Sequence, residues 1–397
     1  MSVTYPRGFR AAGVAAGLKP SGRPDLALLI GDEGTTAAGA FTTNAVAAAP
    51  VRLSQERLRD GGGRAVVVNS GQANAATGAR GERDAIVTTE ATARLLGLDP
   101  REVLQCSTGV IGEPLHVEQM LLGLSDAIEA LGPDGGDAFA SAILTTDTVP
   151  KCSRADAGPY RVGGAAKGVG MISPHLATML AFVTTDAPVT SEELRSITQT
   201  ELVPRFNDLS VDGCTSTNDT VMVFASGAAG GEPVAHPSAA RQELAAAIAA
   251  VGDDLVSQLI HDAEGGTHVV IVQVDGAADE SAARRLATAV ADSPLVKTAA
   301  FGGDPNPGRI VQAVGSAGVE LDPASLDVWV GETELVRGGT IAPSYFSGGD
   351  LRSAARAAMA APEFTIRVRV GDGPGRSQTF GCDLSYEYVR INGEYTT

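Results

Sequence analysis

Strand-like and helix-like apolar patterns alternate along the whole chain of 397 residues, and this alternation limits the possible folds more than any other feature. Short apolar runs over residues 65–69 and 178–184 predict buried strands. Apolar positions three and four residues apart predict helices over residues 80–96 and 238–260. The sequence therefore predicts a mixed α and β fold, although periodicity alone does not give the order of its layers.

The interior of this fold must consist mainly of aliphatic side chains. Apolar residues make up 44% of the chain, but aromatic residues make up only 4%. Alanine-rich helices packed closely against sheets, with 48 glycines at turns and tight contacts, suit this composition. A chain of this length is also more typical of two domains than of one.

Composition and charge argue against several classes of function. The net charge of −17 disfavours nucleic acid as a partner, because binding phosphates requires a basic surface. The four cysteines form no CxxC pair, and the five histidines are scattered, so we expect reduced thiols and no metal site. The N-terminal region lacks a secretory pattern, and the uncharged runs over 34–51 and 168–185 contain too many polar residues and glycines to span a membrane. We expect a soluble, cytoplasmic protein.

The most unusual segment is KGVGMISPHLATMLAFVTTDA, residues 167–187. Small residues and a proline precede Thr178, and a strand-like run follows it, so its hydroxyl is a candidate nucleophile held at the start of a strand. A threonine hydroxyl needs a base, and an N-terminal threonine supplies one through its own α-amine. That chemistry requires a cut between Ala177 and Thr178. By itself, however, a threonine beside an apolar run is usually an ordinary strand residue.

Three further segments carry groups suited to catalysis, although each has an ordinary structural explanation. The turn over residues 106–112 offers hydroxyls and backbone N–H groups of the kind that form an oxyanion hole. The segment SVDGCTSTNDTV, residues 210–221, is a polar connection or a functional loop, with about even support for each. Glu264 follows the long predicted helix and is a candidate partner for a substrate amine, but glutamates near helix ends are usually only solvated.

Taken together, these segments resemble the ornithine acetyltransferase family, the bifunctional glutamate N-acetyltransferases of arginine biosynthesis. The likeness covers essentially the whole chain in order. It is carried by PRGFRAAGVAAGLKPSGRPDLAL, FTTNAVAAAPV, VVNSGQANAATG, STGVIG, TTDTVPK, residues 167–187, residues 210–221, SPLVKTAAFGGDPNPGRI and GCDLSYEYVRINGEYTT. Each string alone is modest, but a collinear series of this length does not arise by chance.

The resemblance implies the roles of individual residues. Thr178 matches the nucleophile, and self-cleavage between Ala177 and Thr178 would leave an α chain of residues 1–177 and a β chain of residues 178–397. Thr108 and Gly109 match the pair that stabilises the oxyanion. The substrate-binding positions of the family match Thr145, Lys167, Thr178, Glu264, Asn392 and Thr397.

The resemblance also implies a ping-pong acetyl transfer from N-acetylornithine to glutamate, with acetyl-CoA as a donor only if the enzyme also performs a synthase-type step. It implies no metal and no organic cofactor, and it implies an assembly of two α and two β chains. The implied fold is an α+β fold, an αββα sandwich with a smaller C-terminal α/β domain. We place the catalytic domain at residues 1–275 and the C-terminal domain, whose tail reaches the active site, at 276–397.

Three positions depart from the pattern expected of this family. Pro307 replaces a tryptophan, His268 replaces a lysine in the loop after Glu264, and His175 stands where asparagine or aspartate is commoner. None of these changes removes a catalytic group, but they leave the substrate range open. The alternatives are a specialised paralogue, an N-terminal-nucleophile amidase or aminopeptidase that uses another acceptor, and a binding protein that never cleaves.

Overall fold

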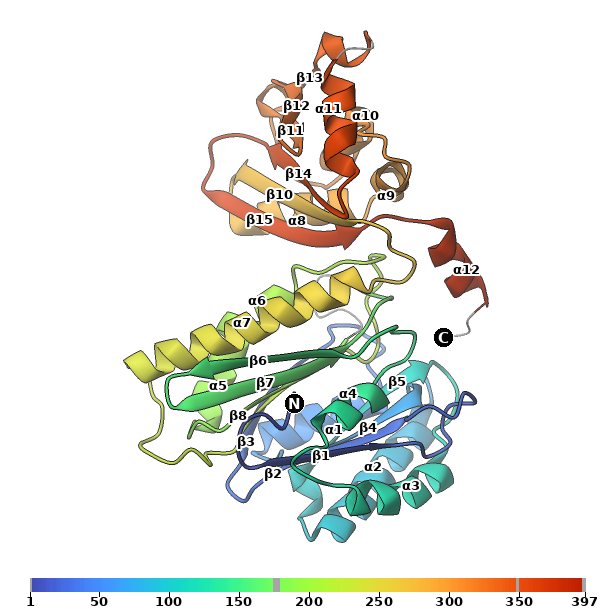
Figure 1. Cartoon of the computed structure of the whole chain (residues 1–397), viewed down its shortest axis with the longest axis vertical. Helices are drawn as coiled ribbons and strands as arrows, with labels where there is room; N and C mark the ends of the chain where they lie inside the picture. Colours follow the sequence, from blue (N-terminus) through green and yellow to red (C-terminus); the bar gives the residue numbers. More distant parts are fainter. Residues whose placement is uncertain (1, 174–178, 348–349, 395–397) are drawn as a thin grey trace. The chain divides into compact units, whose positions relative to one another are not determined.

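The computed structural model describes residues 2–173, 179–347 and 350–394 of the chain (Figure 1). These residues divide into two compact units. Unit 1 comprises residues 1–207 and 214–259, and unit 2 comprises residues 208–213 and 260–395. Each unit has its own sheets and its own hydrophobic core.

The first sheet of unit 1 has the strand order β1-β2-β4-β5. Its strands are β1 (Phe9–Val14), β2 (Leu26–Gly31), β4 (Ala65–Gln72) and β5 (Val103–Val110). Strands β4 and β5 are parallel, and the other neighbours are antiparallel. Helix α2 (Gly78–Leu96) connects β4 to β5, because parallel strands need a crossover of this kind.

The second sheet of unit 1 has the strand order β3-β9-β8-β7-β6. Its strands are β3 (Thr36–Phe41), β9 (Thr220–Ala225), β8 (Leu180–Thr185), β7 (Tyr160–Lys167) and β6 (Lys151–Ala157). Strands β8 and β9 are parallel, and the other neighbours are antiparallel. Every residue of β8 and β9 is buried, as expected for central strands covered on both faces.

The two sheets of unit 1 pack face to face, and helices cover their outer faces. Alternate residues of β2 show this directly: Leu29 belongs to the core shared by both sheets, whereas Leu28 belongs to the core beneath α2 and α3 (Val117–Glu129). On the other side, α7 (Ala239–His261) runs along the second sheet (Figure 1). A Cβ on Gly164 of β7 would lie 2.7 Å from the Val251 side chain, so glycine permits this close packing. The layers are α, β, β, α, and the predicted sandwich is confirmed.

Shorter helices complete unit 1. They are α1 (Ala49–Arg59), α4 (Gly136–Ala142), α5 (Ser191–Ile197) and α6 (Val203–Phe206), with a π-helical turn over Thr198–Leu202 between the last two. Within the described part of the chain, α7 alone is long and apolar enough to cross a membrane, but 61% of its apolar window is buried inside the protein. This degree of burial is typical of a helix in the core of a folded domain.

Unit 2 is built on one six-stranded sheet of order β13-β12-β11-β14-β10-β15. The strands are β10 (Val269–Ala277), β11 (Asp327–Val330), β12 (Thr333–Arg337), β13 (Thr340–Ile341), β14 (Glu363–Arg369) and β15 (Gly375–Cys382). The accompanying helices are α8 (Glu280–Ala291), α9 (Pro294–Phe301), α10 (Pro307–Gly315), α11 (Asp350–Met359) and α12 (Tyr386–Glu394). Alternate valines of β10 pack with apolar residues of α8 in one core. Unit 2 is a smaller α/β domain, as expected.

The division between the units differs from the boundary that we placed after residue 275. Residue 275 lies inside β10, which pairs with β14 on one side and β15 on the other. A strand in the interior of a sheet cannot be divided between two domains without breaking both ladders. The compact units instead divide near residue 259, and residues 208–213 join unit 2 through the bridge between Leu209 and Phe380.

Candidate active site

Strand register places the predicted substrate-binding residue Lys167 in a row with the starts of two neighbouring strands at one end of the second sheet. Lys167 at the end of β7 pairs with Leu180 at the start of β8, and Leu180 pairs with Thr220 at the start of β9. The ends of three neighbouring strands therefore lie in one row. The residues just before β8 and β9, Met179 and Asp219, extend this row by one position.

Lys167 contacts Thr108, which lies in β5 of the first sheet. The Lys167 ammonium donates to the Thr108 hydroxyl over a distance of 3.0 Å, and both residues are buried. Two residues that the sequence analysis named for different reasons are therefore direct neighbours across the sandwich. A buried ammonium beside a hydroxyl forms a strongly electropositive position, since the low dielectric of the interior strengthens its field.

Gly109 follows Thr108 and holds a backbone conformation that other residues rarely adopt. Its φ angle is +125°, and a Cβ would lie 2.3 Å from the carbonyl of Gly71 on the neighbouring strand β4. Only glycine tolerates both the dihedral angle and the close approach. The turn predicted over residues 106–112 begins within β5, which ends at Val110.

The carboxylate of Asp147 connects several parts of this site. Its Oδ1 atom accepts from Lys151 Nζ at 2.6 Å and from the backbone N–H of Gly168 at 2.8 Å. Its Oδ2 atom accepts from the backbone N–H of Thr145 at 3.1 Å. The side chains of Asp147 and Lys151 are fully buried. One carboxylate thereby orders Thr145 and the residue after Lys167, both within the predicted substrate-binding segments.

The charge state of Asp147 follows from its neighbours. Burial alone would raise the pKa of Asp147, but the positive charges of Lys167 and Lys151 outweigh burial and hold the pKa below its ordinary value. The group is therefore an ionised carboxylate that compensates two buried ammonium groups. Such clusters persist only when the charges are paired and hydrogen-bonded.

Asp219 provides a second buried carboxyl group, and its pKa is shifted in the opposite direction. Its Oδ1 atom accepts from the backbone N–H of Met179 at 3.1 Å. Burial raises the pKa of Asp219 well above its ordinary value, although the Met179 hydrogen bond and the charge of Lys167 act against this shift. Asn218, the residue before it, donates to the carbonyl oxygens of Ala73 and Ser107 and ties β9 to the first sheet.

Lys19 lies close to the same charges. Its ammonium donates to the carbonyl oxygens of Leu144 at 2.6 Å and Pro24 at 2.9 Å. Burial, and to a smaller extent repulsion by Lys167, lowers the pKa of Lys19 to about 8. Lys19 therefore holds the chain directly before Thr145, and its own backbone N–H donates to buried Asp25.

In unit 2, two other predicted substrate-binding residues meet. The Asn392 side chain, on α12, donates to Glu264 Oε2 at 2.9 Å. Ser385 donates to the carbonyl oxygen of Gly265, whose Cβ, if present, would lie 2.3 Å from the backbone nitrogen of Tyr388. The loop after α7 is therefore packed against the C-terminal helix, and residues 128 positions apart become neighbours.

His268 continues this loop. Its Nδ1 atom lies 3.1 Å from Asp383 Oδ2, and the backbone N–H groups of Thr267 and His268 both donate to Asp383 Oδ1. Asp383 is buried, so this contact anchors the loop that carries Glu264. The substitution of histidine for the family's lysine is compatible with an ordered loop.

The structure brings the predicted residues into two groups. Thr108, Gly109, Thr145 and Lys167 belong to unit 1, and Glu264 and Asn392 belong to unit 2. Ala177, Thr178, Thr397 and His175 lie outside the described residues. Sequence reasoning missed the supporting charges of Asp147, Lys151, Asp219 and Lys19. The only signal was their position inside the strings that resemble the family, because an aspartate or lysine in a polar segment is normally solvated.

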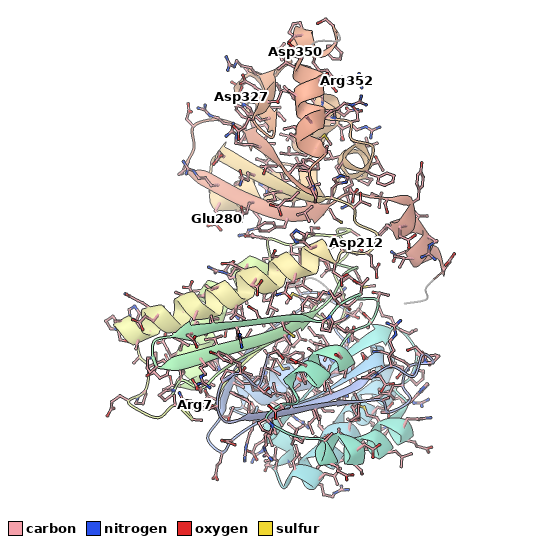
Figure 2. The ribbon with its side chains drawn as sticks, in the orientation of Figure 1. Arg7, Asp212, Glu280, Asp327, Asp350 and Arg352 are labelled. Carbon is pink, nitrogen blue, oxygen red and sulfur yellow. The ribbon has the colours of Figure 1, made fainter. Side chains whose placement is uncertain are left out.

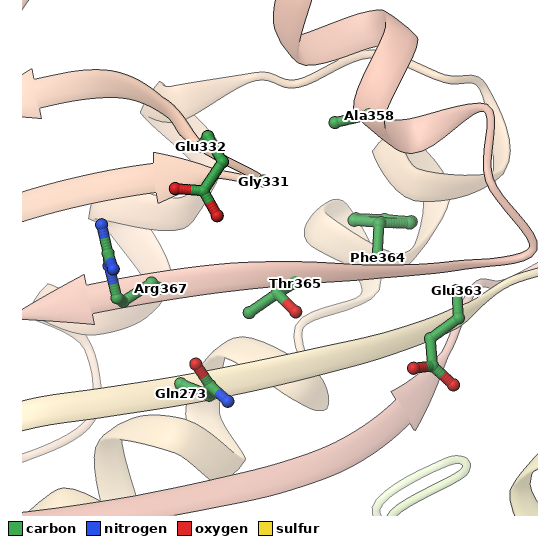
Figure 3. Close-up of a pocket in the computed structure, with 8 residues that line it drawn as sticks. All are labelled: Gln273, Gly331, Glu332, Ala358, Glu363, Phe364, Thr365 and Arg367. Carbon is green, nitrogen blue, oxygen red and sulfur yellow. The ribbon is translucent and has the colours of Figure 1, made fainter.

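Unit 2 also contains a cavity that belongs to neither group. It has a volume of about 320 Å³ and lies beside β14, where Figure 3 shows Arg367 and Glu332 on one side and Glu363 on the other. The Arg367 guanidinium stacks over the ring of Trp329 at 4.3 Å. None of the predicted site residues lines this cavity.

The sequence model of the ArgJ family matches residues 10–397. The chain belongs to the ArgJ family. The arginine biosynthesis bifunctional protein ArgJ of Parasynechococcus marenigrum is 47% identical over 403 residues, covering 100% of this chain and 95% of that protein. Its counterpart in Geobacter sulfurreducens is 44% identical over 395 residues, covering 98% and 99% of the two chains.

A solved structure agrees with this membership. The crystal structure of the arginine biosynthesis bifunctional protein ArgJ from Bacillus halodurans is 35% identical, with a TM-score of 0.50. The matched region covers 54% of this chain and 98% of the Bacillus halodurans chain. The resemblance identified from the sequence is therefore confirmed, and the chain is an acetyltransferase of arginine biosynthesis.

The Asp147 network makes a prediction about stability. Asp147→Asn leaves two buried ammonium groups without their carboxylate, so we expect the free energy of unfolding to fall by about 3–5 kcal/mol. The matched control is Asp186→Asn, because Asp186 is equally buried but pairs with Arg7, whose side chain is 47% exposed and is labelled in Figure 2. Urea denaturation compares the two variants. Equal losses would contradict a special role for the Asp147 cluster.

Lys19 makes a prediction about pH. Its folded-state pKa of about 8 lies below the ordinary 10.5, so between these values the unfolded chain binds more protons than the folded chain. The buried Lys19 ammonium therefore lowers the free energy of unfolding below pH 8, and this loss is recovered as the pH rises toward 10.5. We expect the stability of the wild type relative to Lys19→Met to increase between about pH 7.5 and pH 10, because the Lys19 ammonium of the folded chain loses its proton within this range. Melting temperatures of both proteins across this range test it, and parallel pH profiles would refute the assignment.

Proposed function

We propose that this protein cuts its own chain between Ala177 and Thr178, and that Thr178 then carries acetyl groups from N-acetylornithine to glutamate. The observation that carries the proposal is the buried contact of Lys167 with Thr108 at 3.0 Å. This contact concentrates hydrogen-bond donors and positive charge at the end of the sheet where β8 begins. Electrostatic stabilisation of developing negative charge is usually the largest single contribution to acyl-transfer catalysis.

Self-cleavage gives Thr178 the base that its hydroxyl lacks. Once Thr178 is the first residue of the β chain, its α-amine has a reference pKa of roughly 7.7–8.0, close to the working pH. The amine can then accept the hydroxyl proton as the oxygen attacks. The products of the cut are the α chain of residues 1–177 and the β chain of residues 178–397.

The transfer follows a ping-pong course. Thr178 Oγ attacks the acetyl carbonyl of N-acetylornithine, the carbonyl oxygen becomes negatively charged, and the Thr108 hydroxyl and the Gly109 N–H stabilise it. The bond to the ornithine nitrogen breaks, and ornithine leaves with the proton that the α-amine held. The amine of glutamate then attacks the acetyl-enzyme ester and restores free Thr178.

The positive and negative groups of an amino-acid substrate each require a side chain of opposite charge. An amino-acid substrate carries a carboxylate and an amine, and Lys167 and Glu264 supply a cation and an anion for them. Thr145 supplies a polar group beside Lys167, held in place by Asp147. Asn392 fixes Glu264 through a hydrogen bond of 2.9 Å, and Thr397 adds the end of the chain.

The family resemblance also suggests a setting for this activity. We place the enzyme in the cytoplasm, as an assembly of two α and two β chains, with small molecules as its substrates. The relatives are named bifunctional, so acetyl-CoA is the donor to test for the synthase-type step. Among the departures, Pro307 is the first residue of α10, where its fixed φ angle suits a helix start.

The nucleophile is tested by Thr178→Ala. Without the hydroxyl the chain should remain a single species of 40.3 kDa and should transfer no acetyl group. Thr190→Ala is the control, because Thr190 only caps α5 through a hydrogen bond from Glu193. Intact mass and ornithine release in the presence and absence of glutamate are the measurements. Normal fragments from Thr178→Ala would refute the nucleophile, and equal release without glutamate would indicate a hydrolase.

The oxyanion group is tested by Thr108→Val, which keeps the shape of the side chain but removes the hydroxyl. We expect kcat to fall about 100-fold, as found for the loss of one oxyanion donor. Thr108→Ser keeps the hydroxyl and should retain most of the activity. Steady-state kinetics of the cleaved fraction measure both. A Thr108→Val enzyme with unchanged kcat would remove Thr108 from the site.

A further inference from the structure

Residues 15–25 form a loop that closes on the buried carboxyl group of Asp25. The loop joins β1 to β2, and the Asp25 Oδ1 atom accepts from the backbone N–H of Ala16 at 2.6 Å. The Oδ2 atom accepts from the backbone N–H groups of Leu18 at 2.6 Å and Lys19 at 2.9 Å. Because one completely buried side chain holds three backbone N–H groups, the backbone at Lys19 is fixed before its own side chain makes any contact.

This loop lies against β4, beside one of the residues named for oxyanion stabilisation. The Gln72 side chain donates to the Leu18 carbonyl oxygen at 3.0 Å. A Cβ on Gly71 would lie 2.8 Å from the same oxygen, so only glycine allows the loop to approach the strand this closely. Gly71 is the register partner of Gly109 in β5. Lys19 therefore directly follows a residue that packs one strand away from Gly109.

The side chain of Lys19 reaches the segment that contains Thr145. Its ammonium donates to the carbonyl oxygens of Leu144 at 2.6 Å and Pro24 at 2.9 Å. Leu144 directly precedes Thr145 in the chain. Lys167 is also close enough to act on the charge of Lys19. Lys19 is therefore placed among the residues of unit 1 that were named for substrate binding.

The hydrogen bonds of Lys19 leave one donor for a ligand. An ammonium group can donate three hydrogen bonds, and in the described part of the chain this one has two acceptors, both carbonyl oxygens. No carboxylate of the described residues forms an ion pair with it. Asp25 and Asp147 favour its positive charge at longer range, but burial has the larger effect and lowers its pKa to about 8. A buried cation without a directly bonded anion is unfavourable, and a bound anion would stabilise it.

Lys19 and Lys167 differ in what they contact. The Lys167 ammonium donates to the Thr108 hydroxyl at 3.0 Å, and its charge is compensated by Asp147. Lys19 contacts neither of these side chains directly, since its acceptors are backbone oxygens. Lys19 is therefore suited to act as a second cation for an anionic group of the substrate.

We propose that Lys19 binds the α-carboxylate of the amino-acid substrates through its third N–H group. The inference rests on the proposed function and adds a residue to it. N-acetylornithine and glutamate both carry a carboxylate on the carbon next to the nitrogen that gives up or receives the acetyl group. One cation beside the oxyanion residues can therefore serve the donor and the acceptor in turn. Hydrogen bonds between charged groups are roughly twice as strong as those between neutral groups.

The test compares ornithine with ornithinamide, in which a neutral amide replaces the carboxylate, as ligands of the purified wild type and of Lys19→Met. Loss of a hydrogen bond to a charged group weakens binding by about 10- to 100-fold. We expect this loss for ornithine and a much smaller one for ornithinamide, with Kd measured by calorimetry. In steady-state kinetics, KM for N-acetylornithine and KM for glutamate should both rise, whereas kcat should change less.

Two further variants make the test specific. Lys19→Gln retains two N–H donors but has no charge, so it should lose affinity for ornithine as Lys19→Met does. It replaces Lys19→Met in the comparison if that variant does not fold, as judged by its melting temperature. Arg23→Met removes a positive charge from an exposed side chain of the same loop and should bind ornithine like the wild type.

The outcomes separate this inference from the proposed function. A folded Lys19→Met protein that binds ornithine like the wild type, or that loses equal affinity for ornithine and ornithinamide, would overturn the inference and leave the proposed function intact. A wild-type protein that binds no ornithine and transfers no acetyl group would overturn the proposed function itself.

Discussion

The buried carboxylate of Asp147 is the interaction on which the candidate site depends. It compensates the charges of Lys151 and Lys167 in the buried interior, and it accepts from the backbone N–H groups of Thr145, before β6, and Gly168, after β7. The negative charge of Asp147 stabilises the Lys167 ammonium beside Thr108, because a buried cation is unfavourable unless an opposite charge compensates it. The electropositive position that the chemistry requires is therefore supported by this carboxylate.

The sandwich makes such a charge cluster possible. Two sheets packed face to face, with helices on both outer faces, create a dry interior at the ends of the strands. The small residues of this chain allow the close packing, as at Gly164 beneath α7 and at Gly109 against Gly71. Antiparallel pairing of β7 with β8, and parallel pairing of β8 with β9, then bring three strand ends into one row. Chemistry at this row depends on register rather than on proximity in sequence.

Much of the fold could be predicted, because its signals are local. The apolar run over residues 65–69 lies within β4, and the helices predicted over 80–96 and 238–260 are α2 and α7. The domain boundary could not be placed from the sequence. The local pattern of β10 predicts a strand but does not show that its partners are β14 and β15 of the C-terminal unit. Thr178, the turn over residues 106–112 and Glu264 stood out as candidates from the sequence, but the full set of site residues and their roles came from the resemblance. Nothing in the local pattern distinguishes Thr108 from any other hydroxyl in a turn.

The sequence by itself determined the mixed α and β composition of the fold, the aliphatic character of its core, and membership in the ArgJ family through ordered strings of residues. Only the tertiary structure decided which charged groups are buried next to one another. Asp147 and Asp219 are similar aspartates in similar polar segments, yet the pKa of Asp147 is lowered and the pKa of Asp219 is raised. The reason is physical: a pKa depends on the charges and the water around a group in space, and these are set by strand pairing between residues far apart in the chain.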